Sequence, residues 1–166
     1  MSKLPDAEKL CEQLARELKP HVKAGTAMVG IHTGGAWVAE RLHAALGLKE
    51  PLGMLDSAFY RDDYARQGLA KDPKRSKIPF EVEGKDLLLV DDVLHTGRTV
   101  RAAMNELFDY GRPKSITLVV PAARGGRELP IAAQHVGAQV DVPAGKRLRL
   151  KRAANGRLSL EIESAE

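Results

Sequence analysis

The chain has 166 residues, of which 43% are hydrophobic, 29% charged and 4% aromatic, and this balance fits one globular domain rather than a disordered chain. No apolar run approaches the roughly 18 residues that span a bilayer, and the first residues lack the apolar stretch of a signal peptide. The formal charge of +4 suits an anionic ligand, whereas the low aromatic content argues against a single-strand binder built on stacked bases.

The first half of the chain alternates between helical and extended patterns. Leu10, Leu14 and Leu18 recur at four-residue spacing and predict an amphipathic helix over Asp6–Leu18. Cys11 is the only cysteine, so an internal disulfide is excluded and a cytoplasmic protein is expected. The elements expected next are a strand over Thr26–His32, a turn at Thr33-Gly34-Gly35, a helix over Ala36–Leu46 ended by Gly47, and a strand within Pro51–Tyr60.

Residues Arg61–Pro79 form a charged segment that Gly and Pro interrupt. A stretch of this length without periodicity is typical either of a functional lid or of disorder. We expect a flexible loop at about 61–79, and both interpretations stay open for it.

The second half continues the alternation and ends in a hairpin. Its expected elements are a strand over Asp86–Val90, a helix over Arg98–Tyr110 ended by Gly111, a strand over Ser115–Val120, a loop at residues 121–130 and a short strand within Gln134–Val140. Arg147–Lys151 and Arg157–Ile162 then flank Asn155-Gly156, which is a strong hairpin turn signal. Strands that alternate with helices predict an α/β fold, with a mainly parallel twisted sheet flanked by helices in a single domain over residues 1–166.

The stretch from Leu87 to Thr99 combines a buried strand, two carboxylates and a glycine turn that opens a helix. Asp91 and Asp92 fall at the carboxyl end of the strand, where open α/β sheets bind ligands. The backbone N–H groups at Thr96–Thr99, with no Cβ at Gly97, suit a phosphate. A ribose 5-phosphate offers hydroxyls to the carboxylates and a phosphate to the turn. The alternative is that the acidic pair only caps the helix, but the apolar run before it and the Thr-Gly-Arg-Thr after it favour a binding site.

The same stretch, LLLVDDVLHTGRT, resembles the phosphoribosyl pyrophosphate (PRPP) signature of type I phosphoribosyltransferases. Together with FYRDD from Phe59, GRPKSITL from Gly111 and RGGRELPI from Arg124, it resembles the PyrR family, which comprises pyrimidine-operon regulators with uracil phosphoribosyltransferase activity. The resemblance extends over about Met28–Gly137. It implies the type I phosphoribosyltransferase fold, with hood elements from both ends of the chain and a small C-terminal β-hairpin.

The resemblance also implies a reaction, in which uracil and PRPP give UMP and pyrophosphate. Mg²⁺ is then held mainly by substrate oxygens, with Asp91 as a weak protein ligand. Catalytic roles are implied for Asp91, Asp92 and Arg61. Roles in binding PRPP or UMP are implied for Val90, Val93, Leu94, His95, Thr96, Gly97, Arg98, Thr99, Thr33, Gly34, Gly35 and Arg124.

Three positions depart from the family pattern. Gly34 stands where the family usually has Arg, and we expect that its loss weakens PRPP binding and that an arginine there tightens it. Ala123 replaces an acidic residue and Gly126 a histidine, both near where the pyrimidine is expected. The sequence therefore leaves two functions open: an active enzyme, and a nucleotide sensor that binds its ligand but has lost turnover. Arg124 and Arg127 are free to contact the base, a phosphate or a neighbouring subunit.

The expected partners are PRPP, uracil, UMP or UTP, pyrimidine-operon leader RNA and further copies of the chain, as a homodimer or a higher oligomer. RNA needs a basic surface, and the candidates are Lys71–Lys77 and Lys146–Arg152. Arg147, Arg149 and Lys151 share one face of the expected strand. That face either contacts RNA or is the solvated side of an edge strand.

Overall fold

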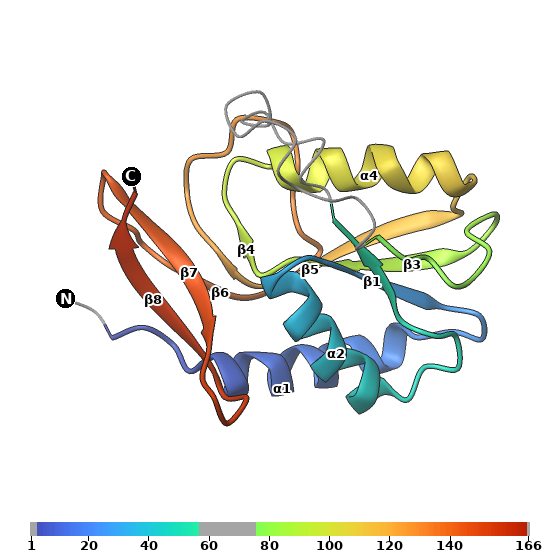
Figure 1. Ribbon diagram of the computed structural model, residues 1–166, viewed down its shortest axis with the longest axis horizontal. Helices are drawn as coiled ribbons and strands as arrows, with labels where there is room; N and C mark the ends of the chain where they lie inside the picture. Colours follow the sequence, from blue (N-terminus) through green and yellow to red (C-terminus); the bar gives the residue numbers. More distant parts are fainter. Residues whose placement is uncertain (1–2, 57–75, 166) are drawn as a thin grey trace.

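A computed structural model describes residues 3–56 and 76–165, and a parallel sheet forms its centre (Figure 1). The strand order is β2-β1-β3-β5-β4, with β6 paired to β5, and every pairing is parallel. The strands are β1 (Ala27–Ile31), β2 (Gly53–Leu55), β3 (Asp86–Val90), β4 (Val93–Leu94), β5 (Ser115–Ala123) and β6 (His135–Gln139). The predicted parallel α/β sheet is confirmed.

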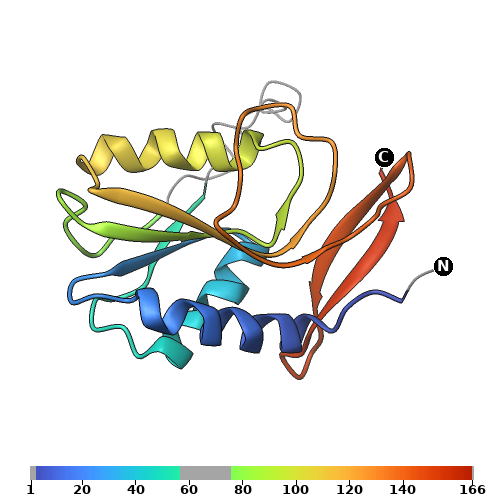
Figure 2. The same cartoon turned by 180° about the vertical axis from the view of Figure 1, so that it is seen from behind.

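Helices cover both faces of this sheet (Figures 1 and 2). Helices α1 (Ala7–Leu18) and α2 (Gly34–Leu46) pack on one face, and α4 (Arg98–Tyr110) packs on the other. A 3₁₀ turn, η1 (Lys19–His21), follows α1. Because both faces are covered, β1 is buried along its whole length, as central parallel strands are.

A two-stranded antiparallel sheet stands beside the carboxyl edge of the main sheet (Figure 1, left). It consists of β7 (Lys146–Arg152) and β8 (Leu158–Ser164). Leu148 lies opposite Ile162, and Leu150 lies opposite Leu160. These leucines join the core against α1, so the predicted hairpin and its alternation are both confirmed.

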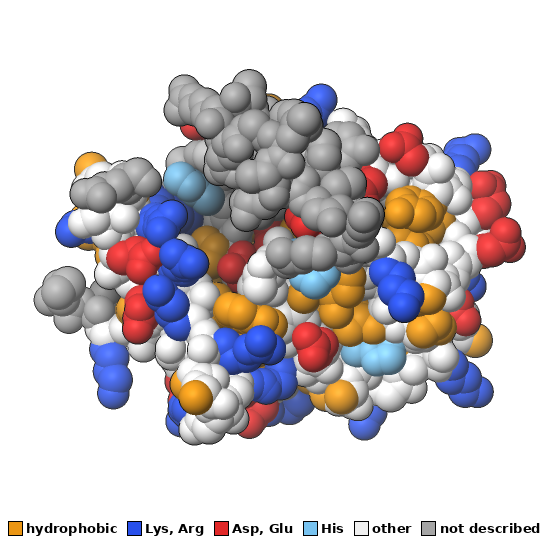
Figure 3. All heavy atoms as spheres, viewed as in Figure 1, with side chains coloured by type: hydrophobic (Ala, Val, Ile, Leu, Met, Phe, Trp, Pro, Cys, Tyr) orange, Lys and Arg blue, Asp and Glu red, His pale blue; other side chains and the backbone are white. Residues whose placement is uncertain are grey.

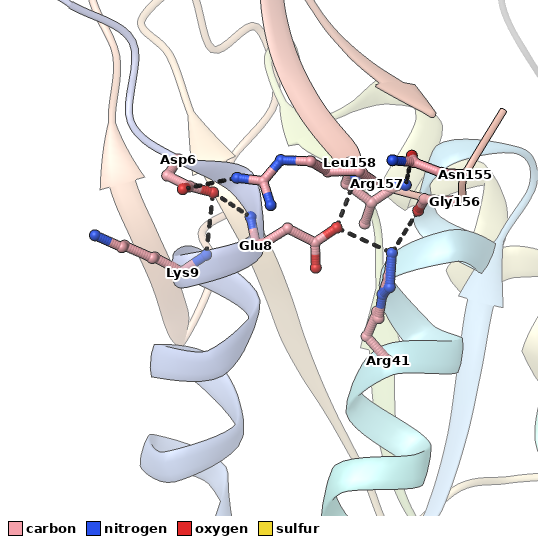
Figure 4. A network of polar contacts seen from close by, with 8 residues as sticks. All are labelled: Asp6, Glu8, Lys9, Arg41, Asn155, Gly156, Arg157 and Leu158. Carbon is pink, nitrogen blue, oxygen red and sulfur yellow. Dashed lines mark hydrogen bonds and ion pairs between the residues drawn. The ribbon is translucent and has the colours of Figure 1, made fainter. Parts of the chain in front are cut away.

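The hairpin is tied to the body by a polar network at its turn (Figure 4). Glu8, in the first turn of α1, accepts hydrogen bonds from Leu158 N at 2.7 Å and from Arg41 Nη2 at 3.0 Å. The same Arg41 nitrogen donates to the Gly156 carbonyl oxygen at 2.6 Å. Arg157 donates to Asp6, the N-cap of α1, at 3.1 Å. One network therefore joins α1, α2 and the hairpin.

The main differences from the sequence prediction concern α2, β5 and β4. Helix α2 begins at Gly34 rather than at Ala36. Strand β5 continues to Ala123, although Pro121 cannot donate to a ladder, because Ala122 and Ala123 pair with both β4 and β6. The short strand β4 was not predicted. Most of the loop predicted at about 61–79 lies outside the described residues, and no helix within the described ranges is long and apolar enough to cross a membrane.

Candidate active site

The two carboxylates that the sequence singled out lie where β3 ends, in the middle of the sheet. Asp91 is 6% exposed, and its backbone N–H continues the ladder by donating to the Val119 carbonyl oxygen at 3.2 Å. Its Oδ1 accepts from Asp92 N at 2.8 Å, and Asp92 Oδ1 accepts from Val93 N at 2.7 Å. These local bonds fix both side chains against the end of the strand.

The Thr33-Gly34-Gly35 segment, here called the TGG loop, packs directly on the acidic pair. A Cβ built on Gly34 would lie 2.1 Å from Asp92 Oδ2 and 2.7 Å from its Cγ. A Cβ on Gly35 would lie 2.6 Å from the Val90 carbonyl oxygen. The glycines thus bring the N-terminus of α2, with its positive dipole end, against the carboxylates. The peptide bond between His32 and Thr33, which enters this loop, is cis.

This contact bears on the expectation for position 34. Tighter PRPP binding by an arginine there stays a prediction, and Asp92 occupies the space into which the Cβ of that arginine would project. No local sequence signal reveals the contact, because Gly34 and Asp92 are far apart in the chain.

The Thr96–Thr99 segment, here called the TGRT loop, leads from β4 into α4. Gly97 is the helix N-cap with φ +95°, a conformation that favours glycine, and it has no side chain with which to cap the helix. Thr96 Oγ1 accepts from Arg98 N at 3.1 Å. Arg98 turns its guanidinium outward to Glu128 Oε1 at 2.8 Å. The loop therefore offers backbone amides and threonine hydroxyls, which suit a phosphate.

Several expected site residues serve the core or the backbone instead. Val90 and Leu94 are 0% and 2% exposed as whole residues, so both serve the core. Val93 packs against the cluster that contains the hairpin leucines. Arg124 donates through Nη1 to the Lys146 carbonyl oxygen at 3.0 Å, which binds it to the start of β7. Arg61 lies outside the described residues.

His95 and Gly126, of which the second departs from the family pattern, face each other. A Cβ built on Gly126 would lie 2.9 Å from His95 Nε2, so the imidazole fills the space of the missing side chain. Burial, and then the positive charges of Arg124 and Arg127, lower the pKa of His95, against an opposing effect of Glu128. The lowered pKa favours the neutral form of the ring.

The departure at Ala123 also has a structural setting. The sequence placed Ala123 in a loop, but it is the last residue of β5 and is fully buried with the α4 side of the core. The strand therefore ends on a small apolar side chain, and the first charged group after it is Arg124.

The hairpin carries a charged face next to the site (Figure 3, left). Three cations of β7 meet two carboxylates of β8. Glu163 contacts Arg147 at 2.7 Å, Arg149 at 3.2 Å and Lys151 at 3.4 Å, and Glu161 contacts Lys151 at 4.0 Å. Most of the basic character that the sequence indicated for Arg147, Arg149 and Lys151 is thus neutralised within the hairpin.

The donor set fits a weakly held Mg²⁺ rather than a cage. Within residues 3–56 and 76–165, no group of three or more His, Cys, Asp or Glu side chains is placed to hold a metal. Mg²⁺ keeps several waters and needs only one or two carboxylates when substrate phosphates supply the other ligands. Asp91 and Asp92, at the carboxyl end of the central strand β3, meet that requirement.

Comparison with known proteins agrees with this geometry. Residues 2–143 match the phosphoribosyl transferase domain family. A bifunctional protein PyrR of Pseudomonas paraeruginosa is 50% identical over 151 residues, which cover 89% of each chain. One from Pseudomonas fluorescens is 47% identical over 164 residues, which cover 96% of each chain.

Solved structures share the fold at low identity. A hypoxanthine-guanine phosphoribosyltransferase of Bacillus anthracis aligns with a TM-score of 0.66 and 19% identity, covering 84% of each chain. A hypoxanthine phosphoribosyltransferase of Staphylococcus aureus aligns with a TM-score of 0.62 and 21% identity, covering 84% of this chain and 74% of the other.

Proposed function

Because this chain belongs to the phosphoribosyl transferase domain family, and within it to the PyrR proteins, we propose that it transfers the phosphoribosyl group of PRPP to uracil. The products are UMP and pyrophosphate. The observation that carries the proposal is the contact between Asp92 and Gly34, which joins the acidic pair, the TGG loop and the helix that follows it into one site. The TGRT loop begins only a few residues after the acidic pair.

Each part of this site has a role in the proposed reaction. The Asp91 and Asp92 carboxylates accept hydrogen bonds from the 2- and 3-hydroxyls and orient the ribose. The TGRT loop binds the 5-phosphate through its amides and hydroxyls. The N-terminus of α2, at Gly34 and Gly35, meets the pyrophosphate with its positive dipole end.

In the chemical step, uracil N1 forms a bond to C1 of the ribose as the bond from C1 to the pyrophosphate oxygen breaks. The uracil proton leaves to solvent. The transition state resembles an oxocarbenium ion, as in other glycosyl transfers, so the carboxylates also stabilise positive charge on the ring. Asp91 would be the protein ligand of Mg²⁺, and the metal would supply positive charge to offset that of the departing pyrophosphate.

The test is the conversion of labelled uracil and PRPP to UMP in the presence of Mg²⁺. We expect turnover by the wild type and a loss of about 100-fold or more in kcat/KM for Asp92→Asn, which is about 2.7 kcal/mol of transition-state stabilisation. Asp109→Asn, on the exposed surface of α4, is the matched control and should behave as the wild type. Absence of UMP with the wild-type protein would refute the transferase.

A second role, a nucleotide-dependent regulator that binds leader RNA of pyrimidine genes, is supported by membership of the PyrR family. It predicts RNA binding that UMP or UTP strengthens and that weakens as salt rises. RNA binding of the same strength with and without UMP or UTP would argue against regulation. RNA binding without turnover would favour the sensor over the enzyme.

A further inference from the structure

The segment Arg124–Ile131, here called the brace, runs alongside the TGRT loop and is bonded to it. The backbone N–H groups of Glu128 and Leu129 both donate to the Thr96 carbonyl oxygen, at 2.9 and 3.2 Å. A Cβ built on Gly97 would lie only 3.0 Å from Ile131 Cβ. The brace and the loop therefore meet without space between them.

Arg127 gathers three backbone carbonyls at this contact. Its Nε donates to the Ile131 carbonyl oxygen at 2.9 Å. Its Nη1 donates to the carbonyl oxygen of Arg124 at 3.2 Å and also to that of His95. One side chain thus joins both ends of the brace to the residue that precedes the TGRT loop. A planar guanidinium offers these donors in a fixed fork, which an ammonium group does not reproduce.

These bonds fix the direction of two N–H groups in the TGRT loop. The C=O and N–H of a trans peptide point in opposite directions, and the peptide bonds of this loop are trans. Because the carbonyls of His95 and Thr96 point at the brace, the N–H groups of Thr96 and Gly97 point away from it. Both donors therefore face the side of the loop that the brace does not cover.

We propose that Arg127 is a positioning residue for phosphate binding, which acts by holding the His95 carbonyl so that the Thr96 and Gly97 amides face the 5-phosphate. The inference rests on the proposed function and deepens it at the same site. It also answers a question that the sequence left open, because the Nε and Nη1 donors of Arg127 are committed to backbone oxygens rather than to a ligand.

The physical reason is preorganisation. A loop whose peptide planes are already oriented loses less conformational entropy when it binds a ligand than a loop that must be ordered at that moment. Loss of the guanidinium should therefore lower the affinity for ligands that carry the 5-phosphate. It should leave unchanged the part of the binding free energy that the pyrimidine contributes.

The experiment compares UMP with uridine, which lacks only the phosphate. Calorimetric titration of UMP, and displacement of UMP by uridine, give both dissociation constants for the wild type, Arg127→Lys and Arg127→Met. We expect the preference for UMP over uridine to fall about tenfold or more in both variants, because neither side chain supplies the fork. In turnover, KM for PRPP should rise while KM for uracil stays unchanged.

Arg112→Lys is the matched control, since Arg112 follows α4 in the chain and is exposed, and it should bind as the wild type does. Arg127→Lys retains the positive charge and is the deciding variant if Arg127→Met does not fold. UMP affinity retained in Arg127→Lys would overturn the proposal, since charge alone would then suffice. A wild type that binds UMP without forming it refutes the transferase, while the UMP affinities still decide the role of Arg127.

Discussion

At the scale of the residue, Gly34 shows how one missing side chain shapes the candidate site. Asp92 Oδ2 lies 2.1 Å from the position of a Cβ on Gly34, so Gly34→Ala forces either the carboxylate or the helix end to move. We expect a destabilisation of about 1–3 kcal/mol, the usual cost of overpacking, and weaker UMP binding. Urea unfolding and UMP titration measure the two effects.

Gly125 provides the control for this substitution. A Cβ on Gly125 meets nothing within 4 Å, so Gly125→Ala should change the stability by less than about 0.5 kcal/mol. If Gly34→Ala is equally neutral, the close approach of the TGG loop to Asp92 is not maintained in solution.

A second residue-scale prediction concerns Glu106, which is only 7% exposed on α4. Burial raises the pKa of this carboxyl above its ordinary value, and the negative charges of Asp56 and Asp109 act in the same direction, against a hydrogen bond from Ser76. A raised pKa means that the folded state holds the proton more tightly. The stability that results is full below the unfolded pKa of about 4.3 and is lost as the pH rises through the folded value.

Glu106→Gln removes this titration. We therefore expect the variant to be more stable than the wild type near neutral pH, with the difference shrinking toward about pH 4. Thermal unfolding across that range measures it, and Glu81→Gln, at an exposed position, should not change the profile. A wild-type advantage that grows with pH would contradict the raised pKa of Glu106.

At the scale of the element, the hairpin depends on α1 more than its sequence suggests. The Leu158 N–H is bonded to the Glu8 carboxylate, and Leu158 is 1% exposed. Glu8→Ala leaves a buried donor unpaired and removes the partner of Arg41, so we expect a loss of about 1–3 kcal/mol. Arg157→Ala breaks the ion pair with Asp6, in which the Arg157 side chain is 60% exposed, and should cost less than about 1 kcal/mol.

Urea unfolding of the two variants makes the comparison. Equal losses would mean that the network of Figure 4 does not distinguish a buried bond from an exposed ion pair.

The elements themselves were largely predictable because each has a local cause. Asp6 caps α1, Gly47 in a left-handed conformation ends α2, and the Asn155-Gly156 turn sets the hairpin. The extension of β5 past Pro121 was not predictable, since it depends on pairing with β4 and β6. The proline predicts the end of the strand, but pairing with strands that are distant in the sequence extends it.

At the scale of the whole molecule, the sequence indicated which segments form the site but not how they touch. The order of buried strands and glycine turns places the TGG loop, Asp91, Asp92 and the TGRT loop at one edge of the sheet. The contact of Gly34 with Asp92, the brace on the TGRT loop and the pairing of β7 cations with Glu163 all join residues far apart in the chain. Packing in three dimensions decides such contacts, and a single sequence does not encode them locally.

The charge of the whole surface leads to the last prediction. Hydrogen bonds from Arg149, Arg147 and Lys151 lower the pKa of Glu163 to about 2, so Glu163 is ionised at every working pH and holds three cations away from an anionic partner. If leader RNA contacts β7, Glu163→Gln releases these cations. We then expect tighter RNA binding. The slope of the logarithm of the binding constant against the logarithm of the salt concentration should become steeper by about 1, the increment for one more phosphate contact.

Filter binding across a salt series measures this effect, with Glu161→Gln as the control. Glu161 forms one long ion pair within the described part of the chain, with Lys151 at 4.0 Å, so its neutralisation should have a smaller effect. Glu163→Gln also removes the carboxylate that pairs with three cations of the hairpin. The unfolding midpoint of the variant is therefore measured alongside, to show that the hairpin remains folded. A folded Glu163→Gln protein with unchanged RNA affinity and salt slope would exclude the β7 face as the RNA contact, because its cations would then be released without consequence.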